Sequence, residues 1–331
     1  MVSRKLLVII DISPDARRQL EDIGFEVFLA GEHGGRDAAV DAVPDAVAVL
    51  TNGSLGLTGN EIAKLPDLKI ISAIGAGFEK IDLGTANARG IVVTNGRGTN
   101  TVAVADHAMT LLLAIAGTIV PSCLAVKGGG WSNFSSPKRD AALPGERTDF
   151  PFKRVGVTGR NLGIFGLGMI GSAIAKRAAN GFEMKIGYTN RRPVADSPYR
   201  FFADLRDLAE WSDFLVLAAP GGEGTYHIVG RDVLDRLGPS GYLVNIGRGS
   251  VVDTDALVEA LQRRAIAGAA LDVVEGEPDI PPVLLTLDNL LLTPHMAGRT
   301  AEAIALMVDL AVRNFAAFFA EEPVVNRVNP A

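Results

Sequence analysis

Short apolar runs alternate with amphipathic segments over residues 1–98. The segments Asp15–Gly24 and Glu61–Leu65 place apolar residues at helical spacing between these runs. Continuous runs of Val, Ile and Leu are typical of strands that are covered on both faces. The pattern therefore predicts a parallel α/β sheet with strands at Leu6–Ile10, Ala46–Leu50, Lys69–Ile74 and Ile91–Val93.

A second alternation of the same kind begins near Leu162. Its apolar runs predict strands at Leu162–Phe165, Met184–Tyr188, Phe214–Leu217, Leu243–Ile246 and Ala267–Leu271. Helical patterns separate them at Ile170–Asn180, Leu205–Trp211, Arg231–Leu237 and Thr254–Arg263. Two such series predict an α/β protein with two doubly wound, Rossmann-like parallel sheets, and the pattern alone favours two consecutive domains.

The longest apolar segment, Val102–Val120, is predicted to be one helix that is buried or lies in an interface. It contains Asp106 and His107, whereas a membrane span needs about 20 mostly uninterrupted apolar residues.

Residues 127–159 include Gly128–Gly130 and are predicted to form an irregular excursion. A loop of this length is usually functional or serves as an interaction arm. The apolar run at the N-terminus is too short for a secretory signal.

Composition narrows the classes of function. Of the 331 residues, 48% are hydrophobic and 21% are charged, which indicates a globular protein. The net charge of −6 argues against nucleic acid or an anionic membrane as a partner. The lone cysteine, Cys123, allows neither an internal disulfide nor a zinc site, so we expect no metal and a reducing, cytoplasmic location. We interpret Cys123 as a buried apolar filler after Pro121, with a catalytic cysteine as the alternative.

A glycine-rich motif follows the predicted strand Leu162–Phe165 and opens a helical pattern. Its residues are Gly166-Leu167-Gly168-Met169-Ile170-Gly171. In a dinucleotide-binding turn the first glycine permits the tight turn, the second admits the pyrophosphate and the third lets helix and strand pack closely. The helix N-terminus also offers free N–H groups to phosphate. The alternative is an ordinary glycine-rich turn of an α/β domain.

The end of the next predicted strand indicates which dinucleotide binds. An NAD site places Asp or Glu there to accept from the ribose hydroxyls. This chain instead has Asn190, Arg191 and Arg192, and two arginines suit a 2′-phosphate. We therefore predict a preference for NADP(H), with NAD(H) as the second choice. A solvated basic turn before Pro193 is the alternative interpretation.

Three further segments would fall at the carboxyl ends of strands, where ligands of open α/β sheets bind. They read NIGRGSVVD from Asn245, LDVVEGEP from Leu271 and TPH from Thr293. In this order, with the glycine motif and with Ile74–Asp82, they make the chain resemble the D-isomer-specific 2-hydroxyacid dehydrogenases over nearly its whole length. Within that family the likeness is greatest to glyoxylate/hydroxypyruvate reductases.

The resemblance implies a catalytic set. His295 would donate the proton to the carbonyl oxygen, and Glu277 would hydrogen-bond the other ring nitrogen and stabilise the imidazolium. Arg248 would bind and polarise the 2-oxo acid. The backbone N–H groups of Ala76 and Gly77 would bind the remaining carboxylate oxygen.

The resemblance also implies cofactor contacts beyond the glycine motif and the basic turn. Asp272 would lie near the nicotinamide carboxamide, and Val104 would pack on the nicotinamide. The other implied contacts are Ala219, Pro220, Thr225, Ile246, Gly247, Arg248, His295 and Gly298. The family more often has a bulkier residue and a Thr where this chain has Gly221-Gly222. We expect no catalytic role for the remaining histidines, His33, His107 and His227.

The resemblance further implies a discontinuous substrate domain, residues 1–98 with 294–331, and an NADP-binding domain, residues 99–293, with the active site in the cleft between them. The C-terminal part of the substrate domain would contain a helix that runs from Thr300 toward Phe319. The implied assembly is a homodimer formed by the apolar helix and the arm that follows it. The expected activity is NADPH-dependent reduction of glyoxylate or hydroxypyruvate to glycolate or D-glycerate.

Two other functions stay open at this point. A regulatory protein could use the same fold as a sensor of NAD(P), because fold alone does not fix function. Another dehydrogenase of the family, such as phosphoglycerate dehydrogenase, is the alternative among enzymes, although the arginine pair disfavours NAD.

Overall fold

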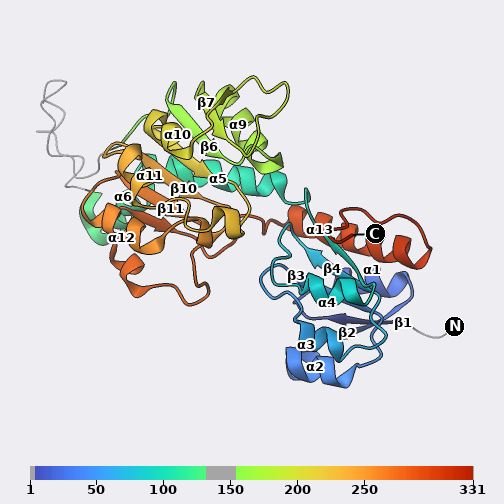
Figure 1. The fold of residues 1–331 in the computed structure, drawn as a ribbon. Coiled ribbons are helices and arrows are strands. Elements are labelled where there is room, and N and C mark those ends of the chain that lie inside the picture. The colour runs from blue at the N-terminus through green and yellow to red at the C-terminus, as the bar shows by residue number, and fades with distance from the viewer. Residues whose placement is uncertain (1–3, 132–153, 331) are drawn as a thin grey trace, which may run out of the picture. The chain divides into compact units, whose positions relative to one another are not determined.

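A computed structural model of the chain describes residues 4–131 and 154–330. By its internal contacts the chain divides into two compact units (Figure 1). The first unit joins Met1–Ala103 with Gly298–Ala331, and the second is Val104–Ala297. The chain therefore passes between the units twice, and its last helix belongs with its first strands.

The first unit is a five-stranded parallel sheet in the order β2-β1-β3-β4-β5. Its strands are β1 (Arg4–Val8), β2 (Phe25–Leu29), β3 (Ala48–Asn52), β4 (Ile70–Ile74) and β5 (Val92–Asn95). The helices are α1 (Pro14–Asp22), α2 (Arg36–Ala42), α3 (Gly59–Ala63), α4 (Leu83–Ala88) and α13 (Ala301–Phe319). This is a doubly wound order, whose direction reverses between β1 and β3, so ligand sites are expected at the carboxyl ends of the central strands.

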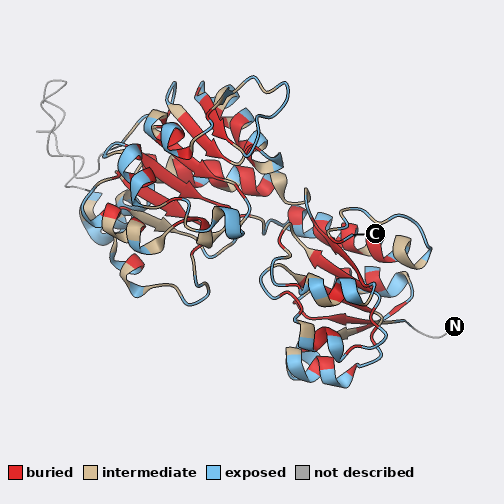
Figure 2. Cartoon of the chain, viewed as in Figure 1, coloured by how far each residue is buried: buried red, intermediate tan, exposed pale blue. Residues whose placement is uncertain are grey.

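The two faces of this sheet carry separate apolar layers, and the strands are buried in Figure 2. Helix α13 supplies Phe315, which is fully buried and meets the ring of Phe25 edge-on at 5.5 Å. Beyond α13 the chain continues along β5, where Asn95 N donates to Asn326 O at 3.1 Å and Val328 N donates to Val93 O at 2.9 Å. The C-terminal segment thus completes the core and protects the edge strand.

The second unit is a seven-stranded parallel sheet in the order β12-β11-β10-β9-β6-β7-β8. Its strands are β6 (Asn161–Phe165), β7 (Lys185–Thr189), β8 (Arg200–Phe201), β9 (Phe214–Leu217), β10 (Tyr242–Asn245), β11 (Gly268–Leu271) and β12 (Leu290–Leu292). The main helices are α5 (Thr101–Ala116), which begins in the first unit, α6 (Ile119–Ala125), α9 (Met169–Phe182), α10 (Leu205–Trp211), α11 (Arg231–Leu237) and α12 (Thr254–Gln262). The order reverses between β6 and β9, which is the arrangement of a dinucleotide-binding Rossmann sheet.

The predicted fold class is confirmed, but three strands were not predicted. Strand β2 alternates buried and exposed residues, because it lies at the sheet edge, and so lacks a continuous apolar run. Strand β8 has two residues, and β12 has three. Edge strands are short and partly exposed, so the apolar pattern that revealed the central strands does not reveal them.

The single helix predicted over Val102–Val120 is wrong. Helix α5 ends at Ala116, and α6 begins at Ile119 after Thr118, whose φ of 50° is left-handed. Among the described residues no single helix is long and apolar enough to cross a membrane; the stretches Thr101–Ala116 and Ile119–Gly130 pass that test only as a pair, bent by 57°. A left-handed residue ends the helical hydrogen-bond ladder, and a periodicity of apolar residues does not report it.

The expectation that Cys123 fills an apolar core is also wrong. Cys123 is an exposed free thiol. It lies on α6, which buries none of its residues. Helix α6 begins after the left-handed residue Thr118, so it does not continue the buried helix α5. Most of the predicted excursion at 127–159 lies outside the described residues; Val126–Gly130 forms one wide helical turn.

Candidate functional site

The glycine-rich turn joins β6 to α9 at the point where the strand order reverses. Gly166 has a φ of +101°, and a Cβ atom placed on it would lie 2.6 Å from the backbone N of Ala219 after β9. Only glycine allows the two strand ends to approach this closely. At Gly168 an added Cβ would meet nothing within 4 Å, so open space lies in front of the helix.

Helix α9 presents its N-terminus to this space. Gly168 is its N-cap residue and provides no side-chain cap for the first N–H groups. A helix of 14 residues carries a positive partial charge at this end. Uncapped N–H groups, a positive end and open space fit the pyrophosphate of a dinucleotide.

The basic turn after β7 has a polar residue that fixes the glycine loop. Asn190 Oδ1 accepts a hydrogen bond from Leu167 N at 2.7 Å. Arg191 and Arg192 are exposed beside it. The role of Asn190 in shaping the glycine loop is a feature that the sequence did not indicate, because it depends on the pairing of β6 with β7.

The loop after β9 adjoins the loop that carries Arg248. Thr225 Oγ1 donates to Pro220 O at 2.8 Å, which closes the turn that includes Gly221 and Gly222. A Cβ atom added at Gly221 would lie 3.0 Å from Cγ of Arg248. The small residue at 221 therefore leaves room for the arginine side chain, which is a local reason for the departure from the family pattern.

Arg248 follows β10 and is held by the last residue of that strand. Asn245 is 1% exposed, and its Nδ2 donates to Arg248 O at 3.0 Å while its Oδ1 accepts from Gly247 N at 3.0 Å. The guanidinium of Arg248, which is half-buried, donates to Gly247 O at 2.8 Å. Asn245 is a positioning residue that sequence reasoning missed, although a polar residue ending an apolar strand was the available signal.

His295 and Glu277 form a hydrogen-bonded pair. The distance from His295 Nδ1 to Glu277 Oε1 is 2.6 Å, and both side chains are partly exposed, at 39% and 35%. Glu277 lies beyond β11 and His295 beyond β12, so two neighbouring strand ends bring them together. Because a carboxylate only accepts, the Nδ1 atom must carry a proton in this contact.

Asp272 holds the loop on which His295 lies. Asp272 is 2% exposed, and its carboxylate accepts from Thr293 Oγ1 at 2.6 Å, Met296 N at 2.9 Å and Ala297 N at 2.9 Å. His295 itself donates its backbone N–H to Asp272 O at 2.8 Å. A buried carboxylate with several donors is a strong local constraint, so Asp272 fixes the backbone of residues 293–297.

His107, to which the sequence assigned no role, belongs to the same network. Its Nε2 atom lies 3.0 Å from Thr293 Oγ1 and 3.5 Å from Asp272 Oδ1. It comes from α5, far away in sequence, and only the fold brings it to this loop. His227 forms another pair, with its Nε2 atom 2.8 Å from Glu275 Oε2.

The remaining predicted residues lie in different parts of the chain. Ala76 and Gly77 follow β4 in the first unit, and Asn95 Nδ2 donates to Ala76 O at 2.8 Å. Gly298 is also in the first unit, next to the side chain of Asn100. Val104 is 5% exposed, so it presents little surface to a ligand, while Arg248, Glu277 and His295 all belong to the second unit.

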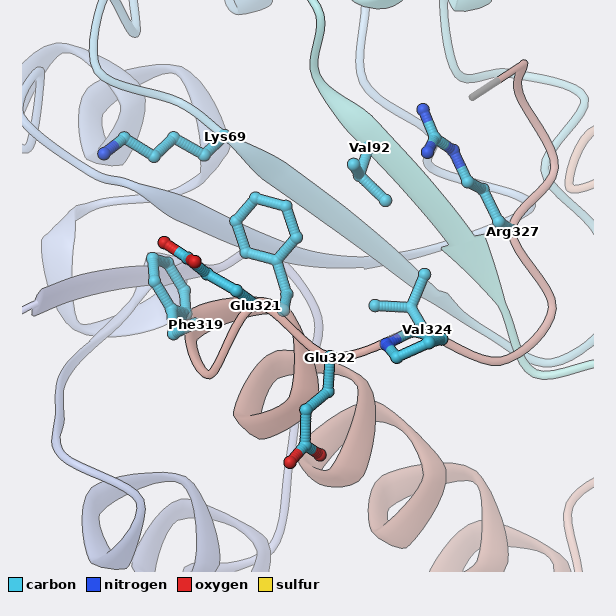
Figure 3. Close-up of a pocket in the computed structure, with 9 residues that line it drawn as sticks. Lys69, Val92, Phe319, Glu321, Glu322, Val324 and Arg327 are labelled. Carbon is cyan, nitrogen blue, oxygen red and sulfur yellow. The ribbon is translucent and has the colours of Figure 1, made fainter.

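A hollow of about 590 Å³ in the first unit does not coincide with these residues (Figure 3). Lys69, which directly precedes β4, and Val92, the first residue of β5, lie on one side of it, and residues at the end of α13 line the other side. It therefore lies at the amino ends of these strands, whereas ligands of open α/β sheets bind at the carboxyl ends. The direction of the strands, and not the presence of a hollow, therefore identifies the candidate site.

The chain belongs to the D-isomer-specific 2-hydroxyacid dehydrogenases. The family model described as "D-isomer specific 2-hydroxyacid dehydrogenase, NAD binding domain" matches residues 109–297. These residues include the glycine turn, Arg248, Glu277 and His295.

Relatives within the family cover most of the chain. A 2-ketogluconate reductase of Gluconobacter oxydans is 38% identical over 285 residues, 86% of this chain and 87% of that protein. A glyoxylate/hydroxypyruvate reductase A of Arabidopsis thaliana is 40% identical over 284 residues, 85% of each. The NADPH-dependent glyoxylate/hydroxypyruvate reductase of Sinorhizobium meliloti, solved with NADP and malonate, is 34% identical, with a TM-score of 0.84 and coverage of 98% of this chain and 97% of that one.

The Asp272 network generates the first prediction. Asp272→Ala removes the acceptor of three hydrogen bonds and leaves their donors unpaired, including the buried N–H group of Ala297. We expect the free energy of unfolding of the second unit to fall by about 3 kcal/mol. We also expect faster amide hydrogen exchange at residues 293–297, measured by mass spectrometry. Asp309→Ala, which removes an exposed pair with Arg313, is the control and should change neither quantity. Unchanged exchange at 293–297 in the Asp272 variant would contradict this role.

Proposed function

We propose that this protein reduces small 2-oxo acids, with glyoxylate and hydroxypyruvate as the expected substrates, to D-2-hydroxy acids with NADPH. The observation that supports this most is the contact between His295 Nδ1 and Glu277 Oε1 at 2.6 Å. An imidazole that donates a proton requires such a partner on its other ring nitrogen. Relatives of this chain are named glyoxylate/hydroxypyruvate reductases, which also supports the proposal.

The side chains have complementary roles in this proposal. Glu277 binds Nδ1, which fixes the ring and its tautomer, so that Nε2 is the atom that delivers the proton to the carbonyl oxygen of the substrate. The Glu277 carboxylate also stabilises the imidazolium before transfer. Arg248 binds the substrate carboxylate and polarises the carbonyl. The hydrogen bond from Asn245 Nδ2 to Arg248 O holds the backbone of this arginine in place. The N–H groups of Ala76 and Gly77 bind the remaining carboxylate oxygen.

The second unit has the features that a dinucleotide requires. When bound, the nicotinamide dinucleotide supplies the hydride that adds to the carbonyl carbon. The uncapped N-terminus of α9 would hold the pyrophosphate, and Arg191 and Arg192 would hold a 2′-phosphate. Ala219 and Pro220 follow β9, and Ile246 and Gly247 follow β10, while Thr225 closes the loop beyond Pro220. Of these residues, Ala219 adjoins Gly166 of the glycine turn.

The cofactor preference is a direct consequence of the turn after β7. We expect kcat/KM with NADPH to exceed that with NADH in the wild type. Arg191→Ala combined with Arg192→Ala should raise KM for NADPH by about 10-fold or more and leave KM for NADH unchanged, because only NADPH carries the 2′-phosphate. Steady-state kinetics with glyoxylate measures both. Arg200→Ala, at an exposed arginine of β8, is the control. Equal kcat/KM for the two cofactors in the wild type would refute the preference.

Proton transfer can be tested at the His295–Glu277 pair. His295→Ala should lower kcat by about 10² to 10⁴-fold, because it removes the proton donor. NADPH should stay bound, because the residues proposed to hold its phosphates are intact. Glu277→Gln should lower kcat less, since the ring is still held but the counter-charge is lost. Arg248→Ala should differ from both by raising KM for the oxo acid as well. Near wild-type kcat in a folded His295→Ala protein with normal cofactor affinity would rule out this mechanism and favour a sensor of NAD(P).

We further propose a homodimer in which α6 forms part of the interface. Ile119, Val120 and Leu124 on this helix are exposed at 56%, 41% and 64% in the single chain. Clustered apolar side chains of this size are more typical of an interface than of a solvated helix.

This assembly predicts a dimer mass by light scattering at micromolar concentration. Leu124→Asp should shift the mass toward the monomer, because it places a charge in an apolar contact. Leu285→Asp, at an equally exposed residue outside α6, should leave the mass unchanged. A monomeric wild type would contradict the proposal.

A further inference from the structure

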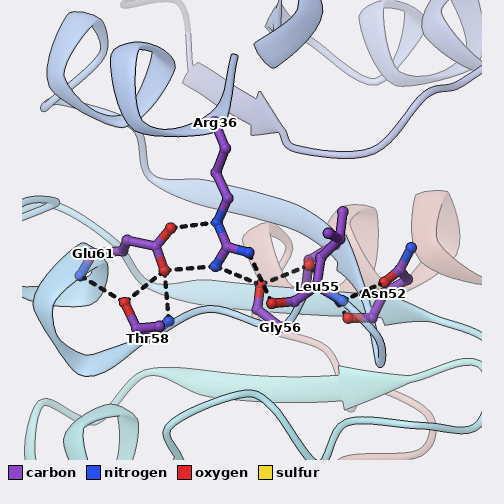
Figure 4. Close-up of polar contacts among 7 residues, drawn as sticks. Arg36, Asn52, Leu55, Gly56, Thr58 and Glu61 are labelled. Atoms are coloured by element: carbon purple, nitrogen blue, oxygen red, sulfur yellow. Dashed lines mark hydrogen bonds and ion pairs between the residues drawn. The ribbon is translucent and has the colours of Figure 1, made fainter. Parts of the chain in front are cut away.

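Arg36, the first residue of α2, makes a set of contacts that the catalytic proposal does not use (Figure 4). Its guanidinium binds both carboxylate oxygens of Glu61, Nη2 meeting Oε2 at 2.6 Å. It also donates from Nη1 to Leu55 O at 2.8 Å and from Nη2 to Gly56 O at 3.4 Å. One side chain thus joins α2 and α3 to the loop that follows β3.

Glu61 is a well-organised partner for this arginine. It is 9% exposed, and its Oε2 atom also accepts from Thr58 N at 2.7 Å and Thr58 Oγ1 at 2.6 Å. Burial alone would raise the pKa of the Glu61 carboxyl, but the hydrogen bonds from Arg36 and Thr58 outweigh it and hold the pKa below its ordinary value. The carboxylate is therefore charged near neutral pH, and the bidentate pair is strong.

The loop held by Arg36, residues 52–56, is otherwise fastened by short polar contacts. Asn52 Oδ1 accepts from Ser54 N at 3.0 Å and Leu55 N at 2.8 Å. Thr51 Oγ1 donates to Gly56 O at 2.8 Å. Residues 53–56 belong to no strand or helix, so these contacts and the two carbonyls bound by Arg36 determine how the loop lies.

This loop packs directly on the turn after β4. A Cβ atom added at Gly53 would lie 2.6 Å from the carbonyl carbon of Gly77, and Leu57 N donates to Lys80 O at 3.2 Å. The two backbones are in contact without an intervening side chain. A shift of the 52–56 loop must therefore move Gly77, because close-packed backbone cannot absorb it.

We infer that Arg36 is a positioning residue for substrate binding: through residues 52–56 it fixes the Ala76–Gly77 N–H groups that bind the carboxylate of the 2-oxo acid. This inference rests on the proposed function. The backbone N–H groups of Ala76 and Gly77 carry no charge. How tightly they bind the carboxylate of the 2-oxo acid therefore depends on their geometry. Arg36 itself does not touch the substrate.

The test is Arg36→Ala in the full-length protein, assayed with glyoxylate and hydroxypyruvate. We expect KM for the oxo acid to rise on the order of 10-fold, since misplacement of a binding group by about 1 Å can cost up to 10²-fold. KM for NADPH should not change, because the proposed cofactor residues 166–171 and 190–192 belong to the other unit. Arg36→Lys should restore binding only in part, because an ammonium cannot hold Glu61 and both carbonyls together.

Two controls separate positioning from a loss of stability. Lys64→Ala removes an exposed pair with Asp41 on the same side of the unit without touching the loop, and should leave KM unchanged. Val40→Ala truncates a fully buried side chain of α2 and lowers the melting temperature while keeping the Arg36 contacts. If Val40→Ala raised KM as much as Arg36→Ala, or if Arg36→Ala left KM unchanged in an active enzyme, the inference would be overturned.

Hydrogen exchange provides a readout besides activity. Arg36→Ala should speed amide exchange at residues 53–57 and 76–80 together, and Val40→Ala should not do so selectively. Faster exchange at 53–57 alone would overturn the coupling to Gly77. A wild-type protein that reduces no 2-oxo acid would refute the proposed function itself and this inference with it, whereas an active wild type with an unaffected Arg36→Ala variant refutes the inference alone.

Discussion

The buried carboxylate of Asp272 is the constraint on which the geometry around His295 depends. It lies at the carboxyl end of β11 and accepts three hydrogen bonds from the chain beyond β12. Removing a charge from water is costly unless donors replace the solvent, and here two backbone N–H groups and a hydroxyl do so. The same contacts give residues 293–297 one conformation. His295, whose φ of 49° is left-handed, could not keep that backbone without them.

Asn245 constrains the loop after β10 in the way that Asp272 constrains the loop after β12. Polar side chains that end buried strands turn the backbone into the next loop and hold it there, so Arg248 and His295 lie on loops but are positioned by the sheet. Parallel strands bring their carboxyl ends to one edge, and each such end contributes one constrained loop. The chemistry is therefore carried by exposed loops and the precision by buried polar groups.

Much of this fold could be predicted from the sequence, because central parallel strands are continuous apolar runs. Helices α10 and α11 have the predicted bounds, Leu205–Trp211 and Arg231–Leu237. The break at Thr118 could not be predicted, because a left-handed backbone conformation does not change the spacing of apolar residues. The edge strands could not be predicted, because they are short and partly exposed and so lack a continuous apolar run.

The candidate site divides in a similar way. Motifs identified His295, Glu277 and Arg248, whose catalytic roles stay predictions. Asn245, which holds Arg248, stands three residues before it at the end of a predicted strand, so a signal for it was present in the sequence. His107 comes from α5, and only the topology brings it near Thr293.

The return of the chain to its first unit also governs the order in which the protein can fold. Val93 N donates to Asn329 Oδ1 across 236 residues, and Phe315 fills the core beneath strands made near the N-terminus. A ribosome releases those strands long before α13, so their sheet stays half-covered while the second unit, a continuous stretch, closes its own core. The N-terminal strands thus spend most of synthesis with apolar faces open to water. The first unit completes its core only once α13 has been synthesised, and until then its open apolar strands favour aggregation.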